Sequence, residues 1–362
     1  MIVLGISDNH DSGACLLKDK EIIAAVNEER LRREKLIGGF PYCSVEKVLE
    51  LSKVSPESID FIVIASVMTP SCLLRLLDRF HDSLRRQTSS FSYLLNLYFI
   101  YQVLIHYLKL PEVAEKLLSI EIIKRRLRTF NLKARFILID HHYAHAASAY
   151  YTSGDDCEAL ILTADAMGDA LSVTVNIGKG RYIKRIFSQS GFSAISTYYS
   201  RLTEFLKFSP LKHEGKITAL AGYGRFNREV MQLAKSQFYF VNKKKIFNVK
   251  NHFIKEAIND RLHKKLKVYL QEDIAYNFQK NFEEEVAKFV EHWVKETNIH
   301  NIYLAGGVFA NVSLNKRLSK INDIKKLYIF PHMGDGGLSL GASLYFLKPV
   351  PFYFKDIYLG PG

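Results

Sequence analysis

The sequence has few cysteines, and none of them stand close together. The four are scattered along the 362 residues: Cys15, Cys43, Cys72 and Cys157. Without a Cys-x-x-Cys pair, a disulfide framework and a cysteine-based zinc site are both disfavoured, and a reducing compartment is favoured. We therefore expect a cytoplasmic location.

A targeting segment and a clear membrane span are also missing. The start, "MIVLGISDNHDSGACLL", has no basic region and no long apolar core, so we expect no signal peptide. The most apolar stretch, residues 91–110, is interrupted by four polar side chains: Ser92, Asn96, Gln102 and His106. Because a spanning helix needs about 20 mostly apolar residues, we expect a buried helix there and no membrane span. Peripheral contact with a membrane stays open.

Charge is the main imbalance, since the formal net charge is +13. Basic residues cluster at 122–128, 242–247 and 261–267. Such an excess can serve nucleic acid or another anionic partner, although a solvated basic face explains it equally simply. No recognised nucleic-acid motif accompanies the charge, so we expect no nucleic-acid partner. A phosphate-bearing substrate would be served as well.

Two segments, 2–30 and 159–190, look like versions of one another. Each reads as a strand, an acidic turn, a second strand, a turn of "KDK" or "GKG", and a third strand. Their separation is too long for a solenoid repeat. A β-meander that opens each of two lobes fits better, and this layout resembles the actin-like ATPase superfamily.

The rest of the pattern predicts an α/β protein. Apolar residues at helical spacing predict helices at 41–54 and 272–298, and buried strands are expected at 59–66 and 134–140. Residues 67–130 are aromatic and basic without a strand signal, so we interpret them as a helical insertion.

Three histidines fall within "IDHHYAHAASAYYTSG", residues 139–154. His141 and His145 are four apart, so on a helix both imidazoles project from one face and can reach one metal. A zinc-protease motif would need glutamate where His142 stands, which excludes that class. The alternative is a first helical turn whose histidines are satisfied by their neighbours.

Two strand–turn–helix units, 301–318 and 325–347, carry glycine-rich turns, and ligands are expected at such strand ends. In "MGDGGLSLG", Asp335 could cap the following helix or act as a third metal ligand. Gly336 beside it would let the backbone approach an anion at the helix start.

Two further loops are candidates for nucleotide binding. "GGVFANVSLN" supplies a tight turn, Gly306 and Gly307, with Asn311 available to the ribose or base. "KHEGKITALAGYG" brings Glu214 and Lys216 together before a helix of small residues. Either loop alone could equally be an ordinary loop.

The front of the chain offers polar groups that could hold an anionic carbonyl donor. "SDNHDSG" places His10 and Asp11 in a turn, and "NEERLRREKLIGGFP" supplies Lys35. Each cluster alone would more often be a polar turn or a solvated helix face.

Taken together, these blocks resemble the nodulation-type O-carbamoyltransferases, a family that also modifies antibiotics. The agreement covers nearly the whole chain, in this order: the front turn, "EERLRREKLIGGFP", "DHHYAHAASAYY", "EGKITALAGYG", "GGVFANVSLN" and "PHMGDGGLSLGAS". The resemblance implies a two-lobed actin-like ATPase fold with duplicated β-meanders. We place the N-terminal lobe at 1–156, with its insertion at 67–130, and the C-terminal lobe at 157–362.

The resemblance also implies the chemistry. His141, His145 and Asp335 would bind a divalent metal, expected to be Fe²⁺, which helps to hold carbamoyl-adenylate made from ATP and carbamoyl phosphate. His10 and Lys35 would lie near the carbamoyl group. A hydroxyl of a small or sugar-like acceptor would attack that group and AMP would leave.

The nucleotide would contact Gly306, Gly307 and Asn311, together with Asp165 and Gly168 of the second hairpin. Asp11, Glu214, Lys216 and Gly336 complete the predicted site.

Two departures from the family pattern concern the phosphate and acceptor contacts. The second hairpin usually reads Asp-Gly-x-Gly-Glu, whereas this chain has "DAMGD", so that Ala166 and Asp169 differ. The helix after "EGK" usually has Met-Gly where Thr218 and Ala219 stand here.

Other functions stay open at this stage. A tRNA threonylcarbamoyltransferase would suit the charge, but its opening turn and histidine block read differently. A non-catalytic actin-like subunit that holds a partner through residues 67–130 is the alternative outside enzymes. The acceptor is not readable from the sequence, and a homodimer is compatible with it.

Family members continue into a second domain that makes carbamoyl-adenylate, and this sequence stops at "YLGPG", about where that domain would begin. We expect the adenylate-forming domain to be absent, either through truncation or because a separate chain supplies it. The purified chain alone should therefore release no pyrophosphate from ATP in the presence of carbamoyl phosphate. Pyrophosphate release by the purified chain would contradict this expectation.

Overall fold

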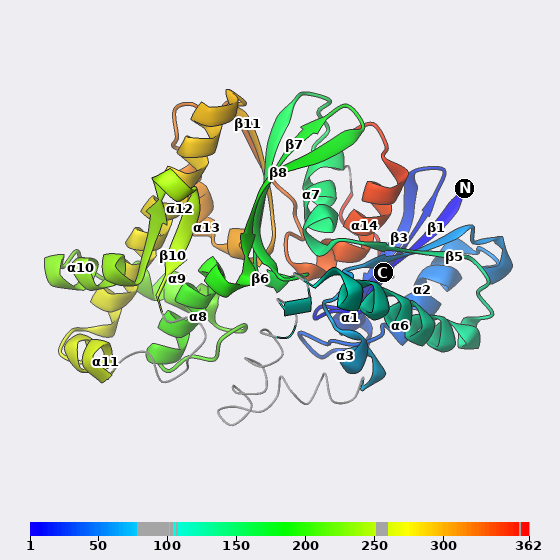
Figure 1. The fold of residues 1–362 in the computed structure, drawn as a ribbon, viewed down its shortest axis with the longest axis horizontal. Coiled ribbons are helices and arrows are strands. Elements are labelled where there is room, and N and C mark those ends of the chain that lie inside the picture. Colours follow the sequence, from blue (N-terminus) through cyan, green and yellow to red (C-terminus); the bar gives the residue numbers. More distant parts are fainter. Residues whose placement is uncertain (78–100, 102–103, 106–107, 251–259, 355, 362) are drawn as a thin grey trace.

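The structure is a computed structural model, and it describes residues 1–77, 101, 104–105, 108–250, 260–354 and 356–361. Two five-stranded sheets with the same strand order carry the fold (Figure 1). The first has the order β3-β2-β1-β4-β5 and the second the order β8-β7-β6-β11-β12. In each, three consecutive strands form an antiparallel meander, and two later strands extend it in parallel.

The strands of the first sheet are β1 (Ile2–Ser7), β2 (Gly13–Lys18), β3 (Glu21–Asn27), β4 (Phe61–Ala65) and β5 (Arg135–Ile139). Those of the second are β6 (Ala159–Gly168), β7 (Leu171–Lys179), β8 (Tyr182–Ser190), β11 (Asn301–Ala305) and β12 (Lys326–Ile329). The predicted duplication of a β-meander is therefore confirmed, and the parallel strands arise where buried apolar runs were expected.

The first sheet is flanked by α1 (Glu28–Arg32), α2 (Tyr42–Ser52), α3 (Cys72–Leu76) and α6 (Lys109–Leu127). Within the insertion predicted at 67–130, the described parts are α3, α6 and short turns, in agreement with its helical pattern. The buried helix predicted at 91–110 lies mostly outside the described residues. Among the helices that the structure describes, none is long and apolar enough to cross a membrane.

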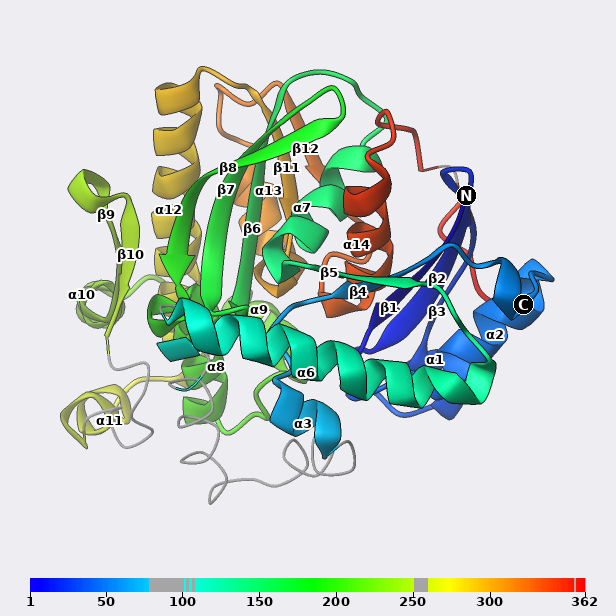
Figure 2. The ribbon, with the colours of Figure 1, turned by 45° about the vertical axis from the view of Figure 1, so that its right-hand side comes forward.

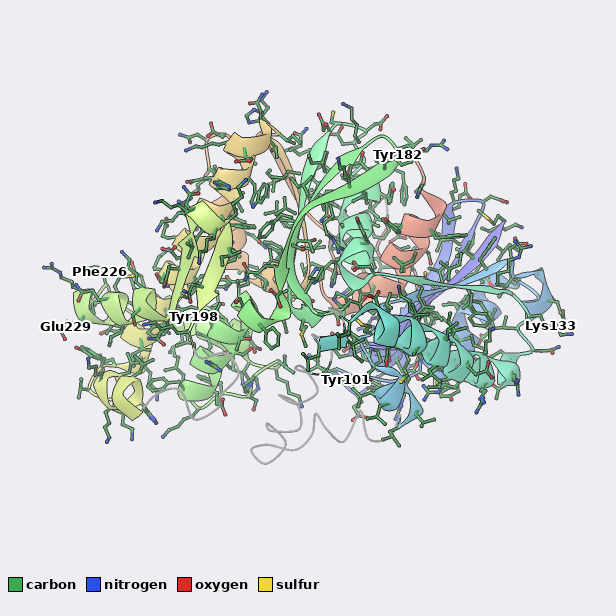
Figure 3. All side chains as sticks on the ribbon, viewed as in Figure 1. Tyr101, Lys133, Tyr182, Tyr198, Phe226 and Glu229 are labelled. Carbon is green, nitrogen blue, oxygen red and sulfur yellow. The ribbon has the colours of Figure 1, made fainter. Side chains whose placement is uncertain are left out.

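The second sheet carries an outer layer of helices: α8 (Ile195–Phe205), α9 (Glu214–Ala221), α10 (Arg228–Gln237), α11 (Asp260–Leu266), α12 (Gln271–Thr297) and α13 (Val312–Leu318). A small hairpin, β9 (Phe238–Val241) and β10 (Ile246–Val249), adjoins them. The apolar stripe predicted on α12 is buried, since Phe278, Phe282 and Trp293 belong to the core of this lobe. Figure 3 places Phe226 and Glu229 at the outer edge of this lobe and Lys133 at the opposite end of the molecule.

Two helices, α7 (His141–Tyr151) and α14 (Leu338–Leu347), lie between the sheets (Figures 1 and 2). They approach closely, because a Cβ on Gly341 would lie 2.0 Å from the carbonyl oxygen of Ala144. A shared core joins these helices to strands of both sheets. Since α14 belongs to the later half of the chain but packs on the first sheet, the lobes interlock. The division between residues 156 and 157 stays a prediction.

One carboxylate ties the second meander to the first sheet. Asp169, in the turn between β6 and β7, is 3% exposed and accepts hydrogen bonds from the backbone N–H groups of Val67, Met68 and Thr69, at 2.7–3.1 Å. It also accepts from the N–H of His141 at 2.9 Å. A carboxylate with two acceptor oxygens suits such a cluster of donors. This contact fixes the start of α7 against both sheets.

Replacing Asp169 with asparagine should destabilise the protein by about 2–3 kcal/mol, because an N–H₂ group would face buried backbone donors and leave some of them unpaired. Urea unfolding of Asp169→Asn measures this loss. The same change at exposed Asp323 is the matched control and should be nearly neutral. Equal stability of the two variants would contradict the importance of this contact.

Candidate metal centre

The histidine helix begins as its sequence predicts. Asp140 follows β5 and caps α7 by accepting a hydrogen bond from the N–H of Tyr143 at 2.9 Å. The guanidinium of Arg185 pairs with the same carboxylate. Alanines and serine fill the buried helix faces, which lets α7 fit between two sheets. The helix thus presents His141 and His145 from one side, one turn apart.

Four buried side chains meet at this side of α7: His141, His145, Asp165 and Asp335. The Nε2 atom of His145 lies 3.3 Å from both Asp165 Oδ2 and Asp335 Oδ1. The Nε2 atom of His141 lies 3.9 Å and 3.7 Å from the same two oxygens. All four potential ligand atoms lie within 4.8 Å of one another. The residues come from α7, from β6 of the second sheet and from the turn before α14.

The outer atoms of three of these groups are held by hydrogen bonds. Ser66 Oγ lies 2.9 Å from His141 Nδ1, and the N–H of Ala166 donates to Asp165 Oδ1 at 2.7 Å. Asp335 Oδ2 accepts from the Nδ2 of Asn9 at 2.7 Å. The inner atoms lack such partners: His141 Nε2, His145 Nε2 and Asp335 Oδ1 are buried without a hydrogen bond. Buried polar atoms are rarely left in this state unless an ion or water completes them.

The pKa values of the four groups depend on one another through their charges. Burial alone would lower the pKa of His145, but the carboxylates of Asp165 and Asp335 raise it to about 9. Burial raises the pKa of Asp335, yet His10 and His141 outweigh it and bring that pKa down to about 2. Both acids are therefore ionised, and their negative charge is held in a buried place where a cation would be strongly favoured.

His142 is turned away from the cluster. Its Nδ1 lies 2.7 Å from Thr163 Oγ1, and its Nε2 lies 3.1 Å from the carbonyl oxygen of Leu171. Burial, followed by the charge of His141, lowers its pKa to about 3, so the ring is neutral. With both nitrogens engaged, it has no lone pair left for a ligand, which agrees with its omission from the predicted set.

The glycines of two predicted loops adjoin the cluster. The N–H of Gly307 donates to Asp165 Oδ2 at 3.4 Å, and Gly306 adopts φ +102° against the backbone of Ala164. Gly168 faces the ring of His141, where a Cβ would lie 2.0 Å from the nearest ring atom. Gly168 thus makes room for a candidate metal ligand, and its contact with a nucleotide stays a prediction.

The front turn reaches the same place. His10 Nδ1 lies 2.9 Å from Asp335 Oδ2. Asn27 Nδ2 donates to the carbonyl oxygens of Asp11 and Gly336, at 3.2 Å each, and so joins two predicted site loops. Lys35 lies in the exposed loop between α1 and α2.

Glu214 and Lys216 make local contacts at the start of α9. Glu214 accepts from the N–H of Leu211 at 2.6 Å, and the Nζ of Lys216 lies 5.8 Å from the centre of the Phe208 ring. Neither belongs to the four-residue cluster. Asn311 caps α13 by accepting from the N–H of Leu314 at 3.0 Å, and it bonds to Gln279.

Sequence reasoning missed several residues that support the cluster. Asp165 was predicted only as a nucleotide contact, although its position at the end of a strand in the second hairpin could have suggested a ligand. Asn9 and Ser66 carry no motif of their own. A buried ion pair, Arg75 to Asp8 at 2.8 Å, anchors the front turn, and α3 brings that arginine from a stretch without any recognisable pattern.

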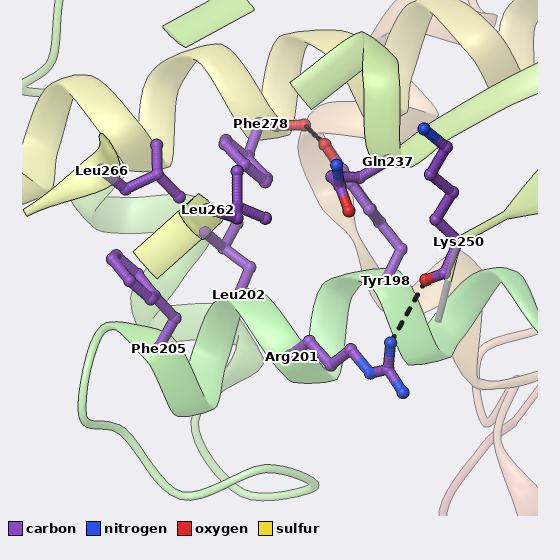
Figure 4. A pocket seen from close by; sticks show the side chains of 9 residues that line it. All are labelled: Tyr198, Arg201, Leu202, Phe205, Gln237, Lys250, Leu262, Leu266 and Phe278. Atoms are coloured by element: carbon purple, nitrogen blue, oxygen red, sulfur yellow. Dashed lines mark hydrogen bonds between the residues drawn. The ribbon is translucent and has the colours of Figure 1, made fainter. Parts of the chain in front are cut away.

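A separate pocket lies among α8, α10, α11 and α12 (Figure 4). Apolar side chains such as Leu202, Phe205 and Phe278 line most of it, and the guanidinium of Arg201 donates to the carbonyl oxygen of Lys250 at 3.2 Å. The predicted site residues are not among its lining. The pocket is therefore separate from the metal centre.

The chain is similar to known proteins over most of its length. An uncharacterized protein of Methanocaldococcus jannaschii is 27% identical over 95% of this chain and 57% of its own length. The nodulation protein NolNO of Sinorhizobium fredii is 27% identical over 92% of this chain and 46% of its own length. The chain thus spans about half the length of these curated relatives.

Solved structures agree on the fold. Component A of the Acidaminococcus fermentans (R)-2-hydroxyglutaryl-CoA dehydratase matches 96% of this chain and 99% of its own, with 12% identity and a TM-score of 0.50. HypF of T. kodakarensis matches 96% of this chain and 47% of its own, with 11% identity and a TM-score of 0.52. The predicted actin-like α/β fold is confirmed.

The sequence model of the carbamoyltransferase N-terminus matches residues 2–344, which is nearly the whole chain. With its duplicated meanders and its histidine helix in place, this chain belongs to the carbamoyltransferase family, whose N-terminal model it matches.

Proposed function

We propose that this chain transfers a carbamoyl group from carbamoyl-adenylate to a hydroxyl of a small or sugar-like acceptor. The observation that carries the proposal is the buried cluster of two imidazoles and two carboxylates, three of whose inner atoms have no hydrogen-bond partner in the part of the chain that the structure describes. Family membership supplies the reaction class. The donor, the acceptor and the metal are parts of the proposal.

The cluster fits a divalent metal, which we propose to be Fe²⁺. Two histidine nitrogens and two carboxylate oxygens form a donor set that suits borderline metals such as iron. Asp165 thereby joins the three ligands expected from the sequence, His141, His145 and Asp335. When bound, such an ion would act as a Lewis acid that withdraws charge from an oxygen of the donor.

His10 is suited to handle the proton of the acceptor. Asp335 is ionised and can only accept hydrogen bonds, so the Nδ1 atom of His10 must carry the hydrogen between them. In the neutral ring, the Nε2 atom of His10 has a lone pair and can act as a general base. Asn9, which donates to the same oxygen of Asp335, helps to fix this geometry.

In the proposed reaction the acceptor oxygen forms a bond to the carbamoyl carbon, and the bond from that carbon to the phosphate oxygen breaks. The acceptor proton passes to His10, and AMP leaves with the electron pair. The ammonium group of Lys35 would stabilise negative charge on the donor. Because the carbamoyl group passes directly to the acceptor, no covalent enzyme nucleophile is needed.

The adenosine part is proposed to lie on the side of the second sheet, at the Gly306–Gly307 turn and Asn311. Gly307 touches Asp165, so a nucleotide bound at this turn would lie next to the cluster. Glu214, Lys216 and Gly336 stay candidates for the ribose and phosphate. We also propose that a separate chain or a further domain makes the carbamoyl-adenylate.

Metal binding gives the first test. Changing His145 to glutamine removes one inner ligand and should lower Fe²⁺ affinity by more than about 100-fold, because changes to groups that only support metal ligands already cost 10–100-fold. The measurement is iron content after anaerobic loading and desalting, by inductively coupled plasma analysis. The matched control is His142→Gln on the same helix, which should retain iron. Equal iron in both variants would argue against this set of ligands.

Turnover gives the second test. His10→Gln should lower AMP release from synthetic carbamoyl-adenylate by about 10²–10⁴-fold, because the general base is lost. The assay measures AMP, and mass spectrometry detects carbamoylated products from a panel of sugars, with the Fe²⁺-loaded protein. His300→Gln, at a half-buried position just before β11 and outside the cluster, is the control. If wild-type protein releases no AMP with any acceptor but binds tRNA tightly and in a salt-dependent manner, the tRNA-modifying alternative is preferred.

A further inference from the structure

A chain of buried polar side chains stands behind Asn311, and the proposed function does not use it. Gln279 on α12 and Tyr199 on α8 are only 3% and 6% exposed. Gln279 bonds to Asn311 through both ends of its amide, at 3.0 and 3.1 Å. Tyr199 continues the chain to Thr218 on α9 at 2.8 Å. Three helices are thereby joined at one asparagine.

The orientation of the Asn311 amide follows from its neighbours. The N–H of Leu314 can only donate, so the group facing it at 3.0 Å must be the oxygen of Asn311. The same oxygen accepts from the Nε2 of Gln279. Both lone pairs of this oxygen are then occupied, and the Nδ2 atom faces the Oε1 of Gln279.

The remaining bonds lock Gln279 in turn. Its two N–H hydrogens go to Asn311 and to the Oε1 of Glu283, the latter at 2.8 Å. Its oxygen accepts from Asn311 and from the hydroxyl of Tyr199 at 2.6 Å. Because Tyr199 donates its only hydroxyl hydrogen to Gln279, its oxygen must accept a hydrogen bond from the hydroxyl of Thr218. Burial raises the pKa of Tyr199, so it keeps this hydrogen.

This count occupies the oxygen of Asn311 fully and commits one hydrogen of its Nδ2 to Gln279, while the other hydrogen has only the hydroxyl of Tyr199 near it among the described residues. We infer that Gln279 is a positioning residue, which presents Asn311 to the nucleotide as a hydrogen-bond donor and never as an acceptor. The inference rests on the proposed function, which puts the adenosine at this residue. The ligand atom that meets Asn311 must then be an acceptor, such as a ring nitrogen of the base or a ribose oxygen.

Thr218 gains a role in this arrangement. A methionine, which the family pattern has at this place, has no hydrogen to donate to Tyr199. The hydroxyl of Thr218 makes the last hydrogen bond of this series, with Tyr199. The threonine that departs from the family pattern therefore has a polar partner here.

The test is AMP binding by calorimetry to the full chain, to Gln279→Met, to Asn311→Ser and to the double variant. Serine can still cap α13, so Asn311→Ser should keep a melting temperature near that of the wild type. Each single change should weaken AMP binding roughly 5- to 10-fold, about the worth of one hydrogen bond. The double variant should bind no more weakly than Asn311→Ser alone, because both changes remove the same bond.

Gln237→Met, at a glutamine that lines the pocket of Figure 4, is the matched control and should bind AMP normally. Tyr199→Phe keeps the ring packing and removes only the hydroxyl, so it gives a second variant if Gln279→Met fails to fold; it should also weaken binding. Wild-type affinity in a folded Gln279 or Tyr199 variant, or losses that multiply in the double variant, would overturn the inference. Absence of AMP binding to the wild type would instead refute the nucleotide site of the proposed function, and the inference with it.

Discussion

Two ionised carboxylates buried beside two imidazoles are the constraint on which the structure depends. Asp165 and Asp335 come from segments of the chain that are far apart in sequence, and like charges in a buried place repel strongly unless cations compensate them. His141 and His145 provide this compensation from α7. The arrangement needs α7 and α14 to lie between the two sheets, and Gly341 permits that close approach.

Hydrogen bonds hold these elements in position. Asp169 fastens the second meander to residues 67–69 and to the first N–H of α7. Its family counterpart is glutamate, yet the shorter aspartate here reaches four backbone donors. Both departures from the family pattern that concern polar contacts, Asp169 and Thr218, thus occur where a neighbouring hydrogen-bond network suits the new side chain.

Much of the fold could be predicted from the sequence, because its determinants are local. The two meanders, α2, α12 and the strand–turn–helix units follow from apolar periodicity and turn residues, within a few positions of their actual bounds. The i, i+4 spacing also predicted that His141 and His145 share a face. For Asp335 the pattern left a helix cap and a metal ligand open, and the family resemblance favoured the ligand.

What could not be predicted depends on contacts between distant segments. Asn9, Ser66 and Gln279 have no motif, and their importance arises only when strands and helices meet. Arg75 lies in the insertion, where the pattern gave helices but no partners. That Gly168 faces the ring of His141 could not be predicted either, because a glycine can make room for a ligand or for a neighbouring ring.

The two β-meanders differ in whether the aspartate at the end of their first strand is free to bind a cation. The first strand of each meander leads to an aspartate: Asp8 follows β1, and Asp165 lies near the end of β6. Arg75 neutralises Asp8 through two hydrogen bonds to its carboxylate, so that this acid is permanently occupied. Asp165 has no guanidinium and faces the cluster. A single arginine from the insertion therefore breaks the internal symmetry, and it determines which of two related strand ends remains available to a cation.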